Sequence, residues 1–193
     1  MSDLILIIFS TALINNIVVD RMIGADPALA FVHKREVADG LCLTMLLLLP
    51  LVTVSAWSLD HWLLAPVHLE YLQLPVFVSA IIVVCWLLKL HAHRMNKKLG
   101  EQIRIFLPFA GINTTVLGAM LLTRESARTF WQALGFGLGS ALGFALVLML
   151  LTAAVERLET ADVPAPFRGL PIQLITLAMI SMAFMGFTGL IKI

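Results

Sequence analysis

The sequence predicts an all-α integral membrane protein with six transmembrane helices, arranged as two inverted three-helix repeats in which helices 1 and 4 are interrupted. Composition is the first observation behind this fold class. Hydrophobic residues make up 60% of the 193 positions and charged residues 13%, and the mean hydropathy is +0.98. Because this leaves too little polar surface to cover a soluble protein of this size, the chain belongs in a membrane.

Long apolar segments are the second observation. A helix rising 1.5 Å per residue needs roughly 20 apolar residues to cross about 30 Å of hydrocarbon, whereas barrel strands alternate over about ten residues. The predicted spans are 4–19, 39–57, 72–89, 104–122, 132–154 and 171–191. We expect a single membrane domain, 1–193. Its first span has no basic n-region or small-residue cleavage site, so we expect it to be retained.

The first span ends in a polar interruption. Asn15 and Asn16 are adjacent amides, and Asp20 and Arg21 follow them before a break at Gly24. An amide in hydrocarbon costs several kcal/mol unless it is hydrogen-bonded, so both asparagines must face protein, a cofactor or water. We expect Asp20 and Arg21 to lie solvated at the cytoplasmic edge.

The second and third spans contain the two cysteines, Cys42 and Cys85. Both lie inside apolar runs and form no Cys-x-x-Cys pattern. This argues against a disulfide framework or a zinc site, and it favours buried small hydrophobic residues.

The fourth span repeats the interruption, which is the third observation behind the fold class. Residues 112–116, Ile-Asn-Thr-Thr-Val, match residues 14–18, Ile-Asn-Asn-Ile-Val, at an offset of 98 that aligns Asn113 with Asn15. The repeats are therefore about 1–97 and 98–193. Three spans per half is an odd number, so the halves are inverted, and such repeats form a site where their broken helices meet. The amides either join the broken helix ends or contact a cofactor or ion.

The fifth span contains Gly135, Gly137, Gly139 and Gly143, a small-residue surface that lets another helix approach closely. A phosphate loop with this spacing needs a preceding strand, which is not predicted here. The sixth span is rich in Met and Phe, which is typical of packing or lipid-facing surface.

The distribution of Lys and Arg predicts the orientation. One face has ten of them: Arg21, Lys34, Arg35, Lys89, Arg94, Lys97, Lys98, Arg104, Arg157 and Arg168. The other face has Arg124, Arg128 and Lys192. Loops one, three and five are therefore expected in the cytoplasm and both termini in the periplasm. A net charge of +1 gives no reason to expect nucleic-acid binding.

Four stretches carry a resemblance to a known family. They are residues 13–18, Leu-Ile-Asn-Asn-Ile-Val; residues 106–118, with Phe-Leu-Pro, Asn and Val-Leu-Gly; the loop 161–169, Ala-Asp-Val-Pro-Ala-Pro-Phe-Arg-Gly; and the end 182–190. Together they resemble RnfA, one of the membrane proteins of Rnf electron-transport complexes, which is related to NqrE of the sodium-translocating NADH:quinone reductase. The resemblance covers the chain from end to end.

The resemblance implies a six-span protein of the bacterial inner membrane that pairs with RnfE, an oppositely oriented homologue, beside RnfB, RnfC, RnfD and RnfG. The complex passes electrons between ferredoxin and NAD through flavins and iron-sulfur clusters and moves sodium ions or protons. In the family, two cysteines from each of the paired proteins hold one [2Fe-2S] cluster within the membrane.

This sequence departs from the family at both cluster ligands. The pattern Gly-x-Cys-Pro has Asp26 at the cysteine position, and the pattern Asn-Cys-x-Val-Leu-Gly has Thr114 there. Neither side chain is a thiolate, so we expect that this chain binds no standard cluster. Asp26 and Thr114 are the candidate site residues, and Asn15, Asn16 and Asn113 support the breaks.

Three roles remain open from the sequence. The first is a component of an Rnf-type complex with the cluster lost or altered, acting as a scaffold or part of the ion path. The second is an independent ion conduit or secondary transporter that uses the breaks as a substrate site, because a carboxylate at Asp26 suits hard cations or protons. The third is a structural partner that positions a cluster-bearing relative.

Overall fold

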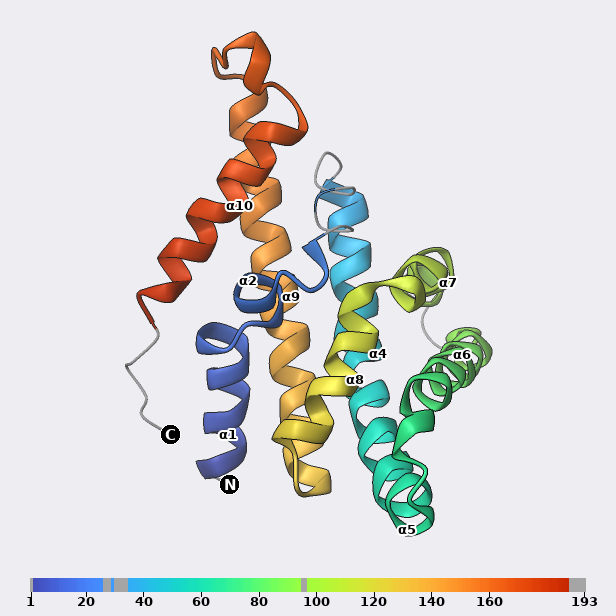
Figure 1. Ribbon diagram of the computed structural model, residues 1–193. Helices are drawn as coiled ribbons and strands as arrows, with labels where there is room; N and C mark the ends of the chain where they lie inside the picture. Colours follow the sequence, from blue (N-terminus) through green and yellow to red (C-terminus); the bar gives the residue numbers. More distant parts are fainter. Residues whose placement is uncertain (1, 26–28, 30–34, 95–96, 188–193) are drawn as a thin grey trace.

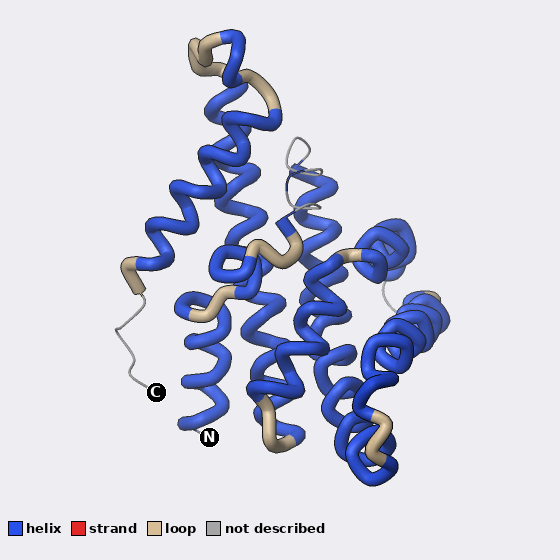
Figure 2. The backbone as a smooth tube through the Cα atoms, viewed as in Figure 1, coloured by secondary structure: helices blue, strands red, loops and turns tan. Residues whose placement is uncertain are grey.

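The computed structural model describes residues 2–25, 29, 35–94 and 97–187, and within them it contains helices, turns and no strand (Figures 1 and 2). The first half comprises α1 (Ser2–Phe9), the π-helix η1 (Ser10–Ile14), α2 (Ile17–Arg21), α4 (Arg35–Leu59), the π-helix η2 (Asp60–Leu64), α5 (Ala65–Val67), the 3-10 helix η3 (Glu70–Leu72) and α6 (Gln73–Ala92). The second half comprises α7 (Lys97–Ile112), α8 (Thr114–Ser126), α9 (Phe130–Glu159), the 3-10 helix η4 (Ala165–Phe167) and α10 (Leu170–Met185).

Among the described residues, three helices are long and apolar enough to cross a membrane, namely Arg35–Leu64, Gln73–Ala92 and Phe130–Glu159. The pair formed by α7 and α8, bent by 64°, counts as a fourth crossing if it is taken as one broken span. The apolar helices Leu4–Ile14 and Leu170–Met185 are shorter. The all-α fold is therefore confirmed, whereas six crossings remain a prediction.

The long helices α4 and α9 pack along each other at the centre of the molecule (Figure 1). Met45 and Leu48 of α4 and Phe144 and Leu148 of α9 are completely buried. Gly137 permits the close approach of the two backbones. A Cβ atom at this position would lie 2.7 Å from Pro50 Cα and 3.1 Å from the Leu49 carbonyl oxygen.

The first interrupted segment packs against the other glycines of α9. A Cβ atom at Gly139 would lie 2.8 Å from the carbonyl oxygen of Ile8, and one at Gly143 would lie 3.0 Å from that of Ala12. Because side chains there would push α1 and η1 away, the predicted role of this small-residue surface in helix packing is confirmed.

Contacts of the two halves come in matching pairs. Helix α1 packs on α9 as α7 packs on α4, and α2 packs on α9 as α8 packs on α4. Helix α10 lies against α9 and α2, just as α6 lies against α4 and α8. Each central helix thus holds the interrupted segment of the other half.

Candidate functional site at the two helix breaks

The first break lies between η1 and α2, at the predicted amide pair. Asn16 precedes α2 with an extended backbone, φ −69° and ψ 119°. Its Oδ1 accepts a hydrogen bond from the Val18 N–H at 3.0 Å, and its Nδ2 donates to the Ala12 carbonyl at 2.8 Å. One buried side chain therefore bonds the last turn of one helix and the first turn of the next.

The second break has the same cap. Asn113 precedes α8 with φ −64° and ψ 132°, and its Oδ1 accepts from the Thr115 N–H at 2.9 Å. Asn113 is 5% exposed and Thr115 is fully buried. Within the described residues, Asn113 Nδ2 and Thr115 Oγ1 have no hydrogen-bond partner, so the break offers an unused donor and an unused hydroxyl.

The caps set the alignment of the two breaks. Asn113 has its counterpart in Asn16, 97 positions earlier, and not in Asn15 as the match of 98 implied. Asn15 is exposed, and its side chain donates to the Ser10 hydroxyl at 3.2 Å. The expected offset was wrong by one residue because only the residue directly before a helix can cap its first turn.

The two breaks are in direct contact. The N–H of Gly24, in the turn after α2, donates to Thr114 Oγ1 at 3.0 Å. Gly24 has φ +85°, and a Cβ atom there would collide with Thr115 Oγ1. Ile23 packs on Gly118: a Cβ atom at Gly118 would lie 2.6 Å from Cγ2 of Ile23. The structure thus brings the Gly24 turn and the start of α8 into one site, as the repeat predicted.

Of the two predicted ligand positions, Asp26 and Thr114, the structure describes Thr114. Asp26 lies outside the described residues. Thr114 is at the site, exposed, with its hydroxyl accepting the bond from Gly24. No group of three or more His, Cys, Asp or Glu that could hold a metal occurs within the described residues. A hydroxyl and amides are a donor set that does not fit a four-thiolate cluster.

The two cysteines belong to other helices than those that the asparagines cap. Cys42 is buried between α4 and α9, with its Sγ 3.8 Å from the Ala145 carbonyl oxygen. Cys85, on α6, packs against α7, and its Sγ would lie 2.9 Å from a Cβ atom at Gly111. The interpretation of both as small packing residues is consistent with these contacts.

Asp20 and Arg21 do not reach the end of the helix bundle, so the expectation that they lie at the cytoplasmic edge is wrong. Their side chains are 57% and 54% exposed and 3.9 Å apart. Helix α2 has five residues and lies beside the middle of α9, where a Cβ atom at Gly143 would be 2.7 Å from Asn16 Nδ2 (Figure 1). A rise of about 7 Å is too short to carry the pair to the end of the bundle.

A cavity of about 430 Å³ with a mixed polar and apolar lining lies next to α2, between η1, α8 and α9. Asn15, Asp20 and Arg21 line it, together with Ser10 of η1 and Gln132 of α9. The sequence reasoning missed Ser10 and Gln132. The available signal was weak, a serine inside the first apolar run.

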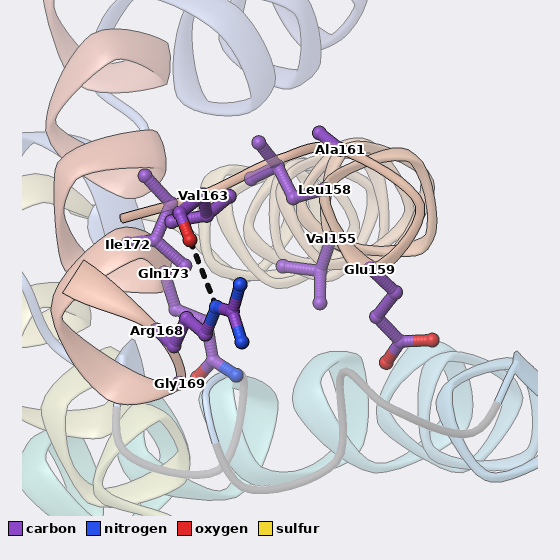
Figure 3. A pocket seen from close by; sticks show the side chains of 9 residues that line it. All are labelled: Val155, Leu158, Glu159, Ala161, Val163, Arg168, Gly169, Ile172 and Gln173. Atoms are coloured by element: carbon purple, nitrogen blue, oxygen red, sulfur yellow. Dashed lines mark hydrogen bonds between the residues drawn. The ribbon is translucent and has the colours of Figure 1, made fainter. Parts of the chain in front are cut away.

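A second cavity, of about 350 Å³, lies at the turn between α9 and α10, under the loop 161–169 (Figure 3). Arg168 folds back over it, and its Nε donates to the Val163 carbonyl at 2.8 Å. Gln173, which is 3% exposed, lines the cavity from the first turn of α10. This distinctive loop therefore has at least a structural role, because its own arginine holds its shape.

The sequence matches a family model described as "Rnf-Nqr subunit, membrane protein", over residues 4–191. The chain belongs to the Rnf-Nqr family. A relative from Histophilus somni (strain 129Pt) is 40% identical over 193 residues, one from Vibrio vulnificus (strain YJ016) is 38% identical over 192, and one from Escherichia coli O1:K1 / APEC is 39% identical over 193. Each comparison covers 100% of both chains.

All three relatives are named as the A subunit of an ion-translocating oxidoreductase complex. The resemblance to the Rnf-Nqr family is thereby confirmed over the full length. Family membership and the apolar helices together establish a membrane protein.

Proposed function

We propose that this chain is a membrane component of an Rnf-type ion-translocating ferredoxin:NAD oxidoreductase complex, where it pairs with RnfE beside RnfB, RnfC, RnfD and RnfG. The observation that carries the proposal is similarity at 38 to 40% identity, over the full length, to the A subunits of ion-translocating oxidoreductase complexes. In this proposal the flavins and other iron-sulfur clusters belong to the partner proteins, and the complex lies in the bacterial inner membrane.

The proposed architecture is six spans in two inverted repeats with both termini in the periplasm. Two features support it. The interrupted segments of both halves carry equivalent asparagine caps, at Asn16 and Asn113, and the helices of the two halves contact one another in matching pairs. Repeats of this kind bring their broken helices together within the membrane.

Reporter fusions test this topology. We expect alkaline phosphatase fused after residue 193 or at Arg128 to be active, and the same reporter fused at Arg94 to be inactive, because only periplasmic loops let it fold. A fluorescent protein fused at the same three positions should give the opposite pattern. Active phosphatase at Arg94 would contradict the orientation.

We propose that the partner protein binds the exposed residues at the two helix breaks. Asp20 and Arg21 are more than half exposed beside the middle of α9, and Thr114 is exposed at the other break. A charged pair and a hydroxyl in contact with lipid are costly, so a protein surface must cover them. RnfE, a homologue in opposite orientation, is the proposed cover.

We further propose that this chain provides no ligands to a standard intramembrane [2Fe-2S] cluster. The Thr114 hydroxyl and the asparagine amides present at the break bind backbone groups, and oxygen donors are poor replacements for four thiolates. The polar side chains at the breaks bind other groups of the same chain: the amides of Asn16 and Asn113 cap the broken helices, and Thr114 joins the two breaks. The remaining roles are scaffold and ion path.

Purification of the complex tests both parts of this proposal. We expect RnfE to copurify with a tagged chain, and the reduced complex to lack the EPR signal of a [2Fe-2S] centre from this pair. The double substitution Asp26→Cys with Thr114→Cys should add the iron of one cluster and a new signal, if the cage geometry is retained. Asp26→Ser with Thr114→Ser is the matched control and should add neither.

Two results would contradict the proposal. A normal [2Fe-2S] signal from the unaltered pair would defeat the loss of the cluster while leaving complex membership intact. Absence of RnfE, with cation uptake by the isolated protein in liposomes that Asp26→Asn abolishes, would instead favour the independent conduit or transporter.

A further inference from the structure

A groove of about 290 Å³ lies between α6 and α7 and ends near the second break, at Ile112. Its walls are apolar and include Ile82 and Trp86 of α6 and Ile112 of α7. Two cations also line it, Lys89 and Arg104, and its described lining contains no carboxylate. The groove therefore combines an apolar floor with an uncompensated positive charge.

Some basic residues have a carboxylate partner within the part of the chain that the structure describes, and Lys89 and Arg104 do not. Arg21, Arg124 and Arg168 each lie within 4.0 Å of an aspartate. Lys89 and Arg104 are exposed, and no ion pair joins either of them to a described carboxylate. Two unpaired cations facing one groove favour an anionic occupant.

The arrangement of the groove along its helices indicates an elongated ligand. Lys89 is seven residues from Ile82 on α6, and Arg104 is eight residues from Ile112 on α7, which correspond to about 10 Å and 12 Å of helix. Both cations thus lie toward the connection between α6 and α7, and the apolar floor extends from them to the second break. In α6 only 22% of the most apolar window is buried by the rest of the chain.

We propose that this groove is a binding site for an anionic phospholipid, whose phosphate lies between Lys89 and Arg104 and whose acyl chain lies on Ile82, Trp86 and Ile112. Basic pockets between transmembrane helices bind the head groups of anionic lipids. Lys and Arg can place their charges at the interface while their stems cover apolar surface, and an indole is favoured at the same level. The lipid would fill the space between α6 and α7 and so support α7 directly before Asn113.

Trp86 provides a probe inside the proposed site. The full-length chain is reconstituted in phosphatidylcholine vesicles that contain increasing fractions of brominated phosphatidylglycerol, and quenching of tryptophan fluorescence is measured. Subtraction of the signal of a Trp86→Phe variant isolates Trp86 from Trp57, Trp62 and Trp131. We expect the Trp86 component to be quenched by brominated phosphatidylglycerol at a much lower fraction than by brominated phosphatidylcholine.

Charge-neutral variants then test the head-group contact. Lys89→Gln with Arg104→Gln should shift the phosphatidylglycerol titration by about 25-fold, or about fivefold for each cation. The control is Arg94→Gln with Lys97→Gln, two exposed cations nearby that do not line the groove. It should shift the titration much less than the groove variant does, because neither side chain lines the groove and so neither holds the phosphate. Circular dichroism melting checks that all variants fold.

Three outcomes would overturn the proposal. The first is equal quenching by the two brominated lipids. The second is an equal loss in the control variant, which would mean only diffuse surface attraction. The third is displacement of the lipid by a neutral isoprenoid quinone regardless of the charges at Lys89 and Arg104, which would assign the groove to a different ligand. None of these bears on copurification of RnfE, so failure here is distinguishable from failure of the proposed function.

Discussion

Replacing Gly137 with leucine is expected to prevent the folded protein from accumulating. The missing side chain at this position lets α9 approach Pro50 and Leu49 of α4, so closely that a Cβ atom would collide with the Thr53 hydroxyl and lie 2.7 Å from Pro50 Cα. Pro50 Cα and the Leu49 carbonyl belong to the backbone, so no change of rotamer relieves the contact. The two central helices must separate, which uncovers the core between them.

The size of the effect follows from the limited stability of folded domains. Overpacking by a few methylene groups costs about 1 to 3 kcal/mol, and Gly137→Ala should fall in this range. Leucine adds more atoms at a site that cannot expand, so we expect a loss of more than about 3 kcal/mol from a total of about 5 to 15 kcal/mol. The measurement is the monodisperse fraction after detergent extraction, together with the melting temperature.

Gly135 offers a matched control two residues earlier on the same helix. A Cβ atom at Gly135 would first meet the tip of the Leu4 side chain, at 2.9 Å, which can rotate away. Gly135→Ala should therefore lower the melting temperature less than Gly137→Ala does. Equal effects of the two alanines would show that the α4–α9 contact does not determine the outcome.

The class of the fold was accessible from the sequence because it depends on sums over many residues. Hydropathy over a span of about twenty residues decides whether a segment enters the bilayer, and a helix is the structure that satisfies its own backbone there. The polar interruptions were equally visible, since adjacent amides at Asn15 and Asn16 stand out in an apolar run. The glycines of α9 indicated a close contact with another helix. They did not indicate which helix would contact each glycine.

What the sequence could not provide depends on single dihedral angles and on contacts between distant residues. Asn16 caps α2 because its own ψ of 119° directs its oxygen to Val18, and no pattern distinguishes it from Asn15. The short length of α2 keeps Asp20 beside the middle of α9, and a left-handed residue, Met22, ends this helix. The bond from Gly24 to Thr114 joins positions 90 residues apart, so it exists only once both halves are folded.

Removing both caps, with Asn16→Leu and Asn113→Leu, is expected to destabilise the two breaks strongly. Each asparagine supplies the acceptor for a buried N–H group of the following helix, that of Val18 or Thr115. Loss of an N-cap costs about 0.5 to 2 kcal/mol, and a buried donor left without a partner costs about 1 to 3 kcal/mol. In the low-dielectric interior no water replaces the lost acceptor. Both figures describe the same lost hydrogen bond, so we expect a loss of about 1 to 3 kcal/mol at each site, which adds up to about 2 to 6 kcal/mol for the pair.

The single variants should differ in a way that identifies the mechanism. Asn16 also donates to Ala12, whereas Asn113 Nδ2 has no partner within the described residues, so Asn16→Leu removes one more hydrogen bond and should be the more damaging change. Serine retains an acceptor of suitable reach, so Asn113→Ser should recover most of the stability lost in Asn113→Leu. The main measurement is the melting temperature of each variant in detergent. A second measurement is whether RnfE copurifies with the variant.

Asn15 is the internal control for this prediction. It occupies the same break and carries the same amide, but it is exposed and its side chain bonds the neighbouring Ser10 hydroxyl in place of a helix end. Asn15→Leu should therefore change the melting temperature little, while Asn16→Leu changes it substantially. If the two adjacent substitutions behaved alike, the cap would not be what holds the break, and the assignment of Asn16 as the counterpart of Asn113 would be wrong. If they differ as expected, the equivalence of the two breaks has an energetic as well as a geometric basis.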